Sequence, residues 1–583
     1  MKKNRGQFWL NRKVAVFSIL LLCGLQAFGA AAARIKRPKA GETVEVLVQY
    51  ATQPTEEHHR RVTNFNGRVR ATFENIPVAH YDVTPEALAD LEANPDVISI
   101  NPNLPVGAFV DRATNSADFW PLSDHYVAIN RGKAAGIGVA ILDSGIDAAH
   151  PNFNCWACTA TRIVYSQSFV GGDTNDGFGH GTHVAGIAVG VDNVTGHSAN
   201  STRDFYGVAM DANIINLKVL NSTGSGTDAS VIAGINRAIA LKSTYNIRVI
   251  NLSLGRPIAQ SYKTDPLCQA VESAWKAGIV VVVAAGNNGR DNSLATGGYG
   301  TITAPGNDPY VITVGASNDN GDYNRANDIM TTYSSKGPTA IDHIVKPDLV
   351  APGNRIVSAQ SPGSTLVTQY PTNQIATDIY NPTGSSAYSP YFFTLSGTSM
   401  ATPIVSGAAA MLIDQNSAIT PDQVKAKLMR TAWRGFPYTM KIPFTDPTTG
   451  VTTNYVENAD LFTIGAGLVD IWAAYNDTTM PAGSATSPSV SVNRYGTVQM
   501  TLNSTSATNV IWGSTSPFAT NVIWGSNVSG TNVIWGSNVI WGSNVIWGSN
   551  VIWGSNVIWG STSPWAASTP GAELLTVAIN GDM

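Results

Sequence analysis

Charged side chains are scarce in this chain: 36 Lys and Arg with 40 Asp and Glu make up only 13% of its 583 residues. Average domains carry about a quarter. The formal net charge of -4 provides no basic field for nucleic acid and no strongly acidic field either, so we expect no nucleic-acid partner. The 54 glycines and the many Ser, Thr and Asn residues are typical of a compact, loop-rich extracellular protein.

Cysteine is also rare, with four residues. Cys23 lies in an N-terminal segment that we expect to be removed, which leaves Cys155, Cys158 and Cys268. The spacing of Cys155 and Cys158 is compatible with a small-loop disulfide, half of a metal site or a redox pair. An N-terminal segment that is removed indicates secretion, which favours the disulfide. No second cysteine pair exists to complete a zinc site. We expect Cys268 to be a buried free thiol and predict no metal site at these cysteines.

The chain has one prominent apolar run near its start, at residues 14–25. Lys and Arg precede this run and small residues follow it, which is the order of a secretory signal peptide. The run is short for a bilayer span, so an uncleaved anchor is the less favoured alternative. We predict a signal peptide at 1–29, a secreted product, and no membrane span in the mature form.

Residues 42–106 are predicted to form a small separate unit. Residues 44–49 alternate as a strand does, and Thr84 followed by Pro85 is a helix start with a cap residue. Further strands are expected near 69–73, 78–83 and 97–100, and a polar helix near 56–64. The resulting order β-α-β-β-α-β is a ferredoxin-like α+β arrangement.

The pattern changes between 136 and about 475, where short apolar runs alternate with helical stretches. The runs at 139–142, 214–219, 249–252 and 279–284 are bounded by Gly, Asn or Asp. This alternation predicts an α/β fold, with a mostly parallel sheet and helices on both faces. In such a sheet, sites form at the carboxyl edge of the strands.

One stretch, 396–403, has the features of an exposed nucleophile. Gly397 before Ser399 and a small-residue helix after it supply a sharp turn and a positive helix end, and Pro403 is compatible with a first turn. Taken alone, the stretch is equally well a tight loop into a buried helix.

Three further polar residues end strands or begin a helix. Asp143 and Asn287 follow apolar strands, and His180 opens a Gly-flanked helix. Each has a plainer explanation in isolation: Asp143 as a helix cap, His180 with His183 as a metal pair at helical spacing, Asn287 as a turn residue.

Together, the motifs around Asp143, His180, Asn287 and Ser399 resemble those of the subtilisin-like serine peptidases, the subtilases, in the family's order. Secondary motifs match as well, at 207–209, 253–255, 346–353 and 465–468. The resemblance implies a secreted serine endopeptidase that hydrolyses protein or peptide substrates, with a peptidase domain at 119–475. It implies no cofactor for catalysis, and it argues against the interpretation of His180 and His183 as a metal-binding pair. We expect His183 to pack or bond inside its helix.

The resemblance also assigns roles. Ser399 would attack the peptide carbonyl, His180 would take and return the proton, and Asp143 would hold the imidazole. The Asn287 amide and the Ser399 N–H would donate to the oxyanion.

Substrate would pair in an extended form between two short segments of the chain. By resemblance these are Ser253, Leu254 and Gly255 on one side and Gly224 and Gly226 on the other. Because Asn288 and the stretch 300–305 carry no charge, we expect an uncharged residue before the scissile bond.

The small N-terminal unit resembles the family's propeptide, which assists folding and blocks the cleft until it is cut. We expect autoprocessing between about 106 and 118, so the chain's own propeptide is a partner. Asn152 stands where many relatives have a calcium-binding Asp, which leaves structural calcium open. The long stretch 359–393 is expected to be a surface loop, with a specificity-shaping rim insert as the alternative.

Residues 476–508 are predicted to be a linker, residues 509–565 repeats and residues 566–583 a tail. The motif Asn-Val-Ile-Trp-Gly-Ser recurs around seven tryptophans: Trp512, Trp524, Trp535, Trp541, Trp547, Trp553 and Trp559. Each unit joins a β-prone run to a turn, so stacked units predict a hexapeptide solenoid or a strip of short strands. The functional interpretations of these repeats are a module that binds a polymer or the cell surface, or an assembly segment. The plainer interpretation is a spacer or a removable tail. A second whole-chain hypothesis is a surface interaction protein with an inert peptidase fold.

Overall fold

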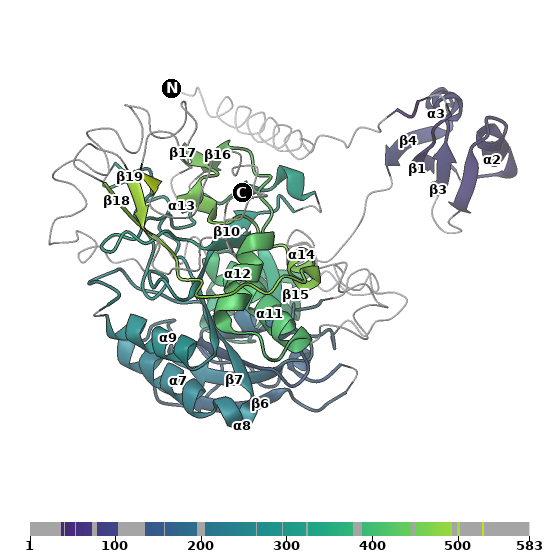
Figure 1. Ribbon diagram of the computed structural model, residues 1–583. Helices are drawn as coiled ribbons and strands as arrows, with labels where there is room; N and C mark the ends of the chain where they lie inside the picture. Colours follow the sequence, from purple (N-terminus) through teal and green to yellow (C-terminus); the bar gives the residue numbers. More distant parts are fainter. Residues whose placement is uncertain are drawn as a thin grey trace, which may run out of the picture. The chain divides into compact units, whose positions relative to one another are not determined.

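The computed structural model describes most of the chain in two compact units, which divide between Val106 and Gly107 and are treated separately here (Figure 1). The described residues are 37–102, 134–492, 498–501, 528–529 and 582, with gaps at 40, 53, 73–77, 157, 195–204, 264, 294, 322–323, 377–387 and 446–449. The predicted signal peptide and the predicted cleavage region lie outside the described residues, as do the predicted repeats except for residues 528–529.

The first unit has the predicted order of elements. These are β1 (Val44–Tyr50), α2 (Glu56–Thr63), β2 (Arg68–Thr72), β3 (Val78–Val83), α3 (Pro85–Glu92) and β4 (Val97–Pro102). The strands form an antiparallel sheet in the order β2-β3-β1-β4. Thr84 caps α3 by accepting from Ala87 N, and Val46, Tyr50 and Tyr81 lie in a small core of their own. The unit is therefore ferredoxin-like.

An eight-stranded sheet is the centre of the second unit. Its strands are β5 (Gly138–Asp143), β6 (Ile163–Ser168), β7 (Asn213–Lys218), β8 (Ile247–Leu252), β9 (Val280–Ala284), β10 (Ile312–Asn318), β11 (Ile329–Met330) and β12 (Leu349–Pro352). Their order is β11-β10-β9-β8-β5-β7-β6, with β12 also paired to β10. Only the β10–β11 pair is antiparallel, so the sheet is mixed but mostly parallel.

Two groups of helices pack on this sheet. One group is α6 (His180–Val189) and α11 (Thr398–Gln415), which contact each other and strands including β5, β8, β9 and β10. The other is α7 (Asp228–Ala240) and α9 (Pro266–Lys276), which lie side by side against β5, β8 and β9 (Figure 1). Short helices are α8 (Lys242–Tyr245), α10 (Thr365–Gln369), α13 (Leu461–Ile464) and α14 (Ile471–Asn476). A further helix, α12 (Pro421–Thr431), contacts α11, α14 and β9.

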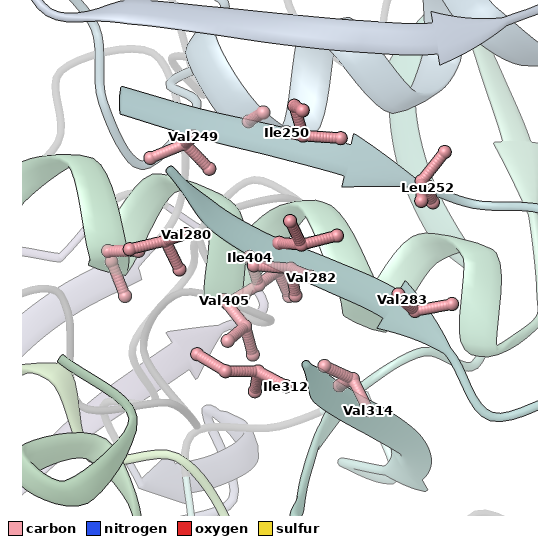
Figure 2. Close-up of a cluster of buried hydrophobic side chains, with 14 of the residues drawn as sticks. Val249, Ile250, Leu252, Val280, Val282, Val283, Ile312, Val314, Ile404 and Val405 are labelled. Carbon is pink, nitrogen blue, oxygen red and sulfur yellow. The ribbon is translucent and has the colours of Figure 1, made fainter. Parts of the chain in front are cut away.

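The main core lies between the sheet and α11. Figure 2 shows side chains of β8, β9 and β10, such as Val249, Val282 and Val314, together with Ile404 and Val405 of α11. Strands β8, β9 and β10 are buried along nearly their whole length, which explains why their sequences read as continuous apolar runs. The core therefore fixes where the strand ends and the start of α11 lie.

Two stretches are more ordered than the sequence suggested. The expected surface loop 359–393 contains α10 and much of a small sheet of β13 (Ile356–Ala359), β14 (Gln374–Ala376) and β15 (Tyr388–Leu395), with Phe392 and Phe393 buried. The expectation of a mere surface loop was therefore wrong. Residues 485–487 of the predicted linker are also buried, and β18 (Ser489–Val492), β19 (Val498–Thr501) and β20 (Val528–Ser529) form a further sheet.

A hairpin of β16 (Thr439–Thr445) and β17 (Thr452–Asn458) completes the second unit. Among the helices that the structure describes, none combines the length and apolar character needed to cross a bilayer.

Candidate active site

The histidine side of the site begins where β5 ends. Asp143 is the last residue of β5, and His180 is the first of α6, after Gly179 at a φ of 103°. His180 Nδ1 lies 2.8 Å from Asp143 Oδ1, and because a carboxylate only accepts, Nδ1 carries the proton. Burial works to lower the pKa of His180, but the charges of Asp143 and Asp176 outweigh it and hold that pKa above its ordinary value.

A second carboxylate, Asp176, is linked to this pair through Ser144 and was missed by the sequence analysis. It is buried and accepts hydrogen bonds from Ser144 Oγ (2.8 Å), Gly179 N (2.7 Å) and Thr182 N (2.7 Å). Burial raises the pKa of Asp176, although these donors oppose the rise. Ser144 in turn lies 3.2 Å from Asp143 Oδ1, so Asp176 ties the start of the histidine helix to the end of β5. Its position four residues before His180 was the available signal.

The serine side begins at Gly397, the residue before α11. Gly397 has a φ of 144°, which favours glycine, and Ser399 is the second residue of the helix. Ser399 Oγ donates to Ser253 O (3.1 Å), and Ser253 Oγ donates to Ser399 O (2.8 Å). The two serines therefore hold each other reciprocally.

Pro403 explains why the Ser399 carbonyl accepts a hydrogen bond from Ser253. It is the sixth residue of α11, so our expectation of a first-turn proline was wrong. A proline has no N–H to offer the carbonyl four residues earlier, which is that of Ser399. The Ser253 hydroxyl satisfies the carbonyl instead. The helix thus gives up one internal bond, and the freed carbonyl fastens the segment after β8 to the start of α11.

Asn287 lies beside Ser399 in a fixed orientation. Its Oδ1 accepts from Thr398 N (2.9 Å) and Thr398 Oγ1 (2.9 Å), which leaves Nδ2 as the free donor end of the amide. A Cβ atom on Gly397 would lie 3.0 Å from Asn287 Nδ2 and 3.6 Å from Ser399 N. Two N–H donors thus border a space that glycine keeps open, and this arrangement can stabilise a developing oxyanion.

The predicted substrate segments flank the carboxyl end of β5. Ser253, Leu254 and Gly255 follow β8, Gly224 and Gly226 follow β7, and β5 lies between these two strands. Arg256 Nε bonds Asp228 Oδ1 (2.8 Å) and so joins the chain just beyond each segment. Gly255 has no room for a side chain, because a Cβ there would lie 2.6 Å from Thr303 Oγ1.

Hydrogen bonds connect the predicted residues as two groups. Asp143 and His180 form one, and Ser399, Asn287 and Ser253 form the other through Thr398 and the serine exchange. Among the described residues no hydrogen bond joins Ser399 Oγ to His180. The helices that carry them, α6 and α11, pack against each other.

Comparison with known proteins identifies this arrangement. The model of the subtilase family matches residues 134–467. The chain belongs to the subtilase family. Over 369 residues it is 36% identical to serine protease AprX of Bacillus subtilis (strain 168), covering 62% of this chain and 75% of that protein. It is 35% identical over 302 residues to subtilisin DY of Bacillus licheniformis (52% and 85%), and 32% identical over 384 residues to subtilisin E of Bacillus subtilis (strain 168) (64% and 79%). The protein is a subtilisin-like serine endopeptidase, a hydrolase that acts on protein substrates.

His183 of this subtilase is packed in the interior, as expected, but its ring makes hydrogen bonds outside its own helix. Its Nε2 donates to Ile356 O (3.1 Å) and Phe393 O (3.0 Å), on β13 and β15. Burial, reinforced by the nearby His180, lowers the pKa of His183 to about 3, so its ring is neutral. Within the described ranges, no three His, Cys, Asp or Glu residues are grouped so that they would hold a metal ion.

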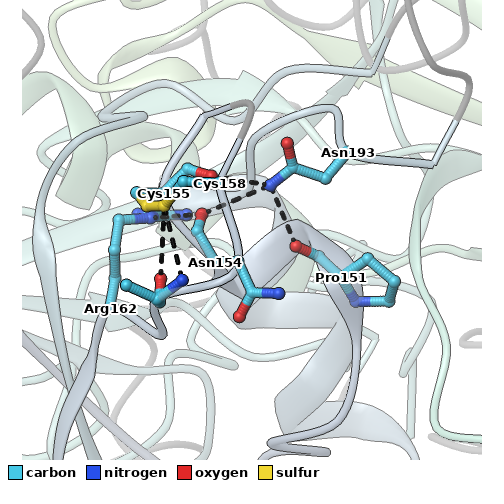
Figure 3. The surroundings of a disulfide bond; sticks show 7 residues. Pro151, Asn154, Cys155, Cys158, Arg162 and Asn193 are labelled. Carbon is cyan, nitrogen blue, oxygen red and sulfur yellow. Dashed lines mark hydrogen bonds between the residues drawn. A yellow bond between two sulfur atoms is a disulfide. The ribbon is translucent and has the colours of Figure 1, made fainter.

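The subtilase's cysteines take two forms. Cys155 and Cys158 form a disulfide with a Cα–Cα distance of 5.3 Å (Figure 3), and Asn193 Nδ2 donates to the carbonyl of Cys155 (3.0 Å). Cys268 is a buried free thiol that lies 3.3 Å from Asn307 Oδ1, and burial raises its pKa. An unreactive buried thiol follows from that surrounding.

A buried arginine, Arg162, lies beside Asn152, the residue that stands where many relatives have a calcium-binding Asp. The Arg162 guanidinium donates to the carbonyls of Asn152 (3.0 Å), Asn154 (3.0 Å), Val189 (2.6 Å) and Ala212 (3.0 Å). Figure 3 shows Arg162 beside Asn154 and the disulfide. Burial lowers the pKa of Arg162 to about 10, which leaves it charged at neutral pH. Calcium needs six to eight oxygen ligands. Among the described residues here, the carbonyls already surround a cation, and the buried Asn152 amide without a hydrogen-bond partner offers a single oxygen, so these residues do not fit calcium.

Proposed function

We propose that this subtilase cleaves peptide bonds with Ser399 as nucleophile, His180 as general base and acid, Asp143 as the partner of His180, and Asn287 as an oxyanion donor. The observation that carries the proposal is the pair of donors beside Gly397. Thr398 holds Asn287 so that its Nδ2 and the Ser399 N–H face the same space, next to the hydroxyl that would attack.

The proton steps follow from the histidine tautomer. Because Nδ1 carries the proton shared with Asp143, Nε2 has a free lone pair and accepts the proton of Ser399 as Oγ attacks the substrate carbonyl. The imidazolium then returns the proton to the leaving amine. Water repeats the sequence on the acyl-enzyme, with His180 again as base.

The position of the Ser399 hydroxyl suggests that substrate binding helps to activate this nucleophile. The hydroxyl donates to the Ser253 carbonyl, which lies on the predicted substrate segment. An extended substrate that pairs with this segment would offer a backbone N–H to the same carbonyl. Substrate would therefore displace the Ser399 hydroxyl and release it to turn toward His180.

We further propose an uncharged residue before the scissile bond. Asn288 and the stretch 300–305 carry no charge, and the nearby Lys336 is buried and paired with Glu457 (2.7 Å). Its charge is thereby kept from the surface. In a peptide library, cleavage after Lys or Arg as fast as after uncharged residues would overturn this preference.

The ferredoxin-like unit supports a propeptide role, in which residues 42–106 assist folding, block the cleft and are removed by the enzyme itself. We propose a secreted, extracellular product whose catalysis needs no metal. The active alternative is favoured over an inert fold because Asp143, His180, Asn287 and Ser399 are all present, with Asp143 bonded to His180 and Asn287 held beside Ser399 by Thr398.

The decisive experiment is the intact mass of the secreted product, with a casein assay, for wild type and Ser399→Ala. We expect wild type to lose the segment up to about residue 118 and to cleave casein, and the variant to retain residues 44–103 and to be inactive. Ser417→Ala, which changes an exposed serine after α11, is the matched control and should behave as wild type. Identical processing with equal activity in Ser399→Ala would exclude Ser399 as nucleophile.

A further inference from the structure

Asp582 lies deep in the second unit although it follows the tryptophan repeats. It is 2% exposed, and its side chain and backbone both make hydrogen bonds to the body of the unit. The partners are Arg290, Thr332 and Asn354, which lie 228 to 292 residues earlier in the chain. Segments far apart in the sequence therefore meet at this residue.

The three partners form a pocket that recognises an aspartate within a peptide. Oδ1 accepts from Arg290 Nη2 (2.8 Å) and Thr332 Oγ1 (2.7 Å), and Oδ2 accepts from Thr332 N (2.7 Å). Asn354 pairs with the backbone: its Nδ2 donates to Asp582 O (2.9 Å) and its Oδ1 accepts from Asp582 N (2.8 Å). The pocket therefore selects for the charge of the aspartate, the length of its side chain and the direction of its backbone.

The charge of Arg290 makes the occupant of this pocket important. The Arg290 side chain is 6% exposed and packs over the ring of Phe444 (3.5 Å). It forms a salt bridge with Asp582 (2.8 Å). Removing one partner of a buried ion pair leaves the other charge uncompensated, which is strongly destabilising.

The pocket lies between the two loops that carry the oxyanion donors. Arg290 follows Asn287 by three residues in the same loop. On the other side, Asn354 follows Gly353, whose carbonyl accepts from Gly397 N (2.8 Å), two residues before Ser399. Tyr333, next to Thr332, bonds both loops through its hydroxyl to Gly353 O (3.0 Å) and its carbonyl to Gly289 N (2.8 Å).

We propose that the Arg290–Thr332–Asn354 pocket is a docking site for the chain's own segment around Asp582, and that Asp582 is thereby a positioning residue for the oxyanion donors. The positioning role rests on the proposed function of Asn287 and Ser399.

The first test uses full-chain Asp582→Ala and Asp582→Asn, with Asn580→Ala as a control in the same segment. We expect both Asp582 variants to lower Tm by roughly 5 °C because a buried charge loses its partner. We expect kcat on an uncharged peptide substrate to fall about tenfold with little change in KM, since misplaced catalytic groups slow the reaction rather than binding. Unchanged Tm and kcat in both variants would overturn the proposal.

The second test supplies the segment in trans, as a fluorescently labelled peptide with the sequence of residues 578–583, Ala-Ile-Asn-Gly-Asp-Met. It should bind full-chain Asp582→Ala in a Ser399→Ala background, fail to bind when Arg290→Met is added, and raise kcat of active Asp582→Ala. The same peptide with Ala in place of the Asp is the control. Absence of binding, or binding unaffected by Arg290→Met, would overturn the docking site. Binding does not require Asn287 or Ser399 to be catalytic, so failure of the proposed function is detected separately.

Discussion

The two sides of the active site are built from different materials. The histidine side contains two buried carboxylates, Asp143 and Asp176, around one imidazole. The serine side, made by Ser399, Ser253, Asn287 and Thr398, contains no charged group and relies on hydroxyls, an amide and backbone N–H groups. Proton transfer needs a tuned charge, whereas oxyanion stabilisation needs dipoles that are already in place. Damage to the first side should therefore change the pH profile, and damage to the second should lower the rate equally at every pH.

The largest break in this comparison is Asp143→Asn. An amide in place of the carboxylate can hold the wrong histidine tautomer and does not stabilise the imidazolium, so we expect kcat to fall by about 10⁴-fold. Initial rates on a chromogenic peptide across a range of pH measure this effect. A loss below tenfold with an unchanged pH profile would contradict the role of Asp143.

Asn287→Ala tests the uncharged side. Loss of one oxyanion donor should lower kcat by about 10²- to 10³-fold while KM and the pH profile stay unchanged, since no titrating group is altered. The same peptide assay measures it. If the pH profile moves instead, the two sides are not separate in the way described.

Asp176→Asn should act on pH more than on the maximal rate. His180 must be neutral to accept a proton, so activity rises as pH passes its pKa, which Asp143 and Asp176 hold above the ordinary value. Removing the charge of Asp176 lowers the pKa of His180, and the acidic limb of the profile should move to lower pH. Ser144→Ala, which removes one hydrogen bond to Asp176 but keeps both charges, should move that limb less. A limb that stays in place in Asp176→Asn would show that Asp176 acts only as a structural brace.

Removal of divalent metal ions should have the smallest effect. The described residues of both sides contain no group of His, Cys, Asp or Glu that could hold a metal ion, and Arg162 already supplies a cation to the carbonyls beside Asn152. We expect kcat and Tm to be unchanged after EDTA treatment and dialysis. Arg162→Met should lower Tm, because several buried carbonyls lose their donor. A fall in Tm with EDTA that added calcium reverses would contradict the expectation.

Local patterns were sufficient for the elements and for the residues at strand ends. The glycines around His180 and Ser399 and the apolar runs before Asp143 and Asn287 mark positions where the chain must turn at the carboxyl edge of a sheet, and the structure has these turns. The ferredoxin-like order of the first unit was likewise visible in strand alternation and in the Thr84 cap.

Long-range contacts were not visible in the same way. In the sequence, Asp176 lies between Asn175 and Gly177 and looks like a solvated loop carboxylate; its burial arises from the packing of α6 on β5. The proline of α11 was placed too early because the start of a helix depends on where Gly397 docks. Asp582 could not be found because its partner Arg290 is 292 residues away. The roles of the individual residues, the domain boundaries and the function of the repeats stay predictions.

The pairing of Arg290 with Asp582 also sets an order in time. Synthesis proceeds at about 5–20 residues per second, so the 292 residues between them take about 15 to 60 s to make. During that interval Arg290, in the loop next to Asn287, has been made, but Asp582, whose carboxylate neutralises the Arg290 charge, has not. The enzyme's oxyanion site would therefore be among the last parts to become complete, after the repeats have been produced.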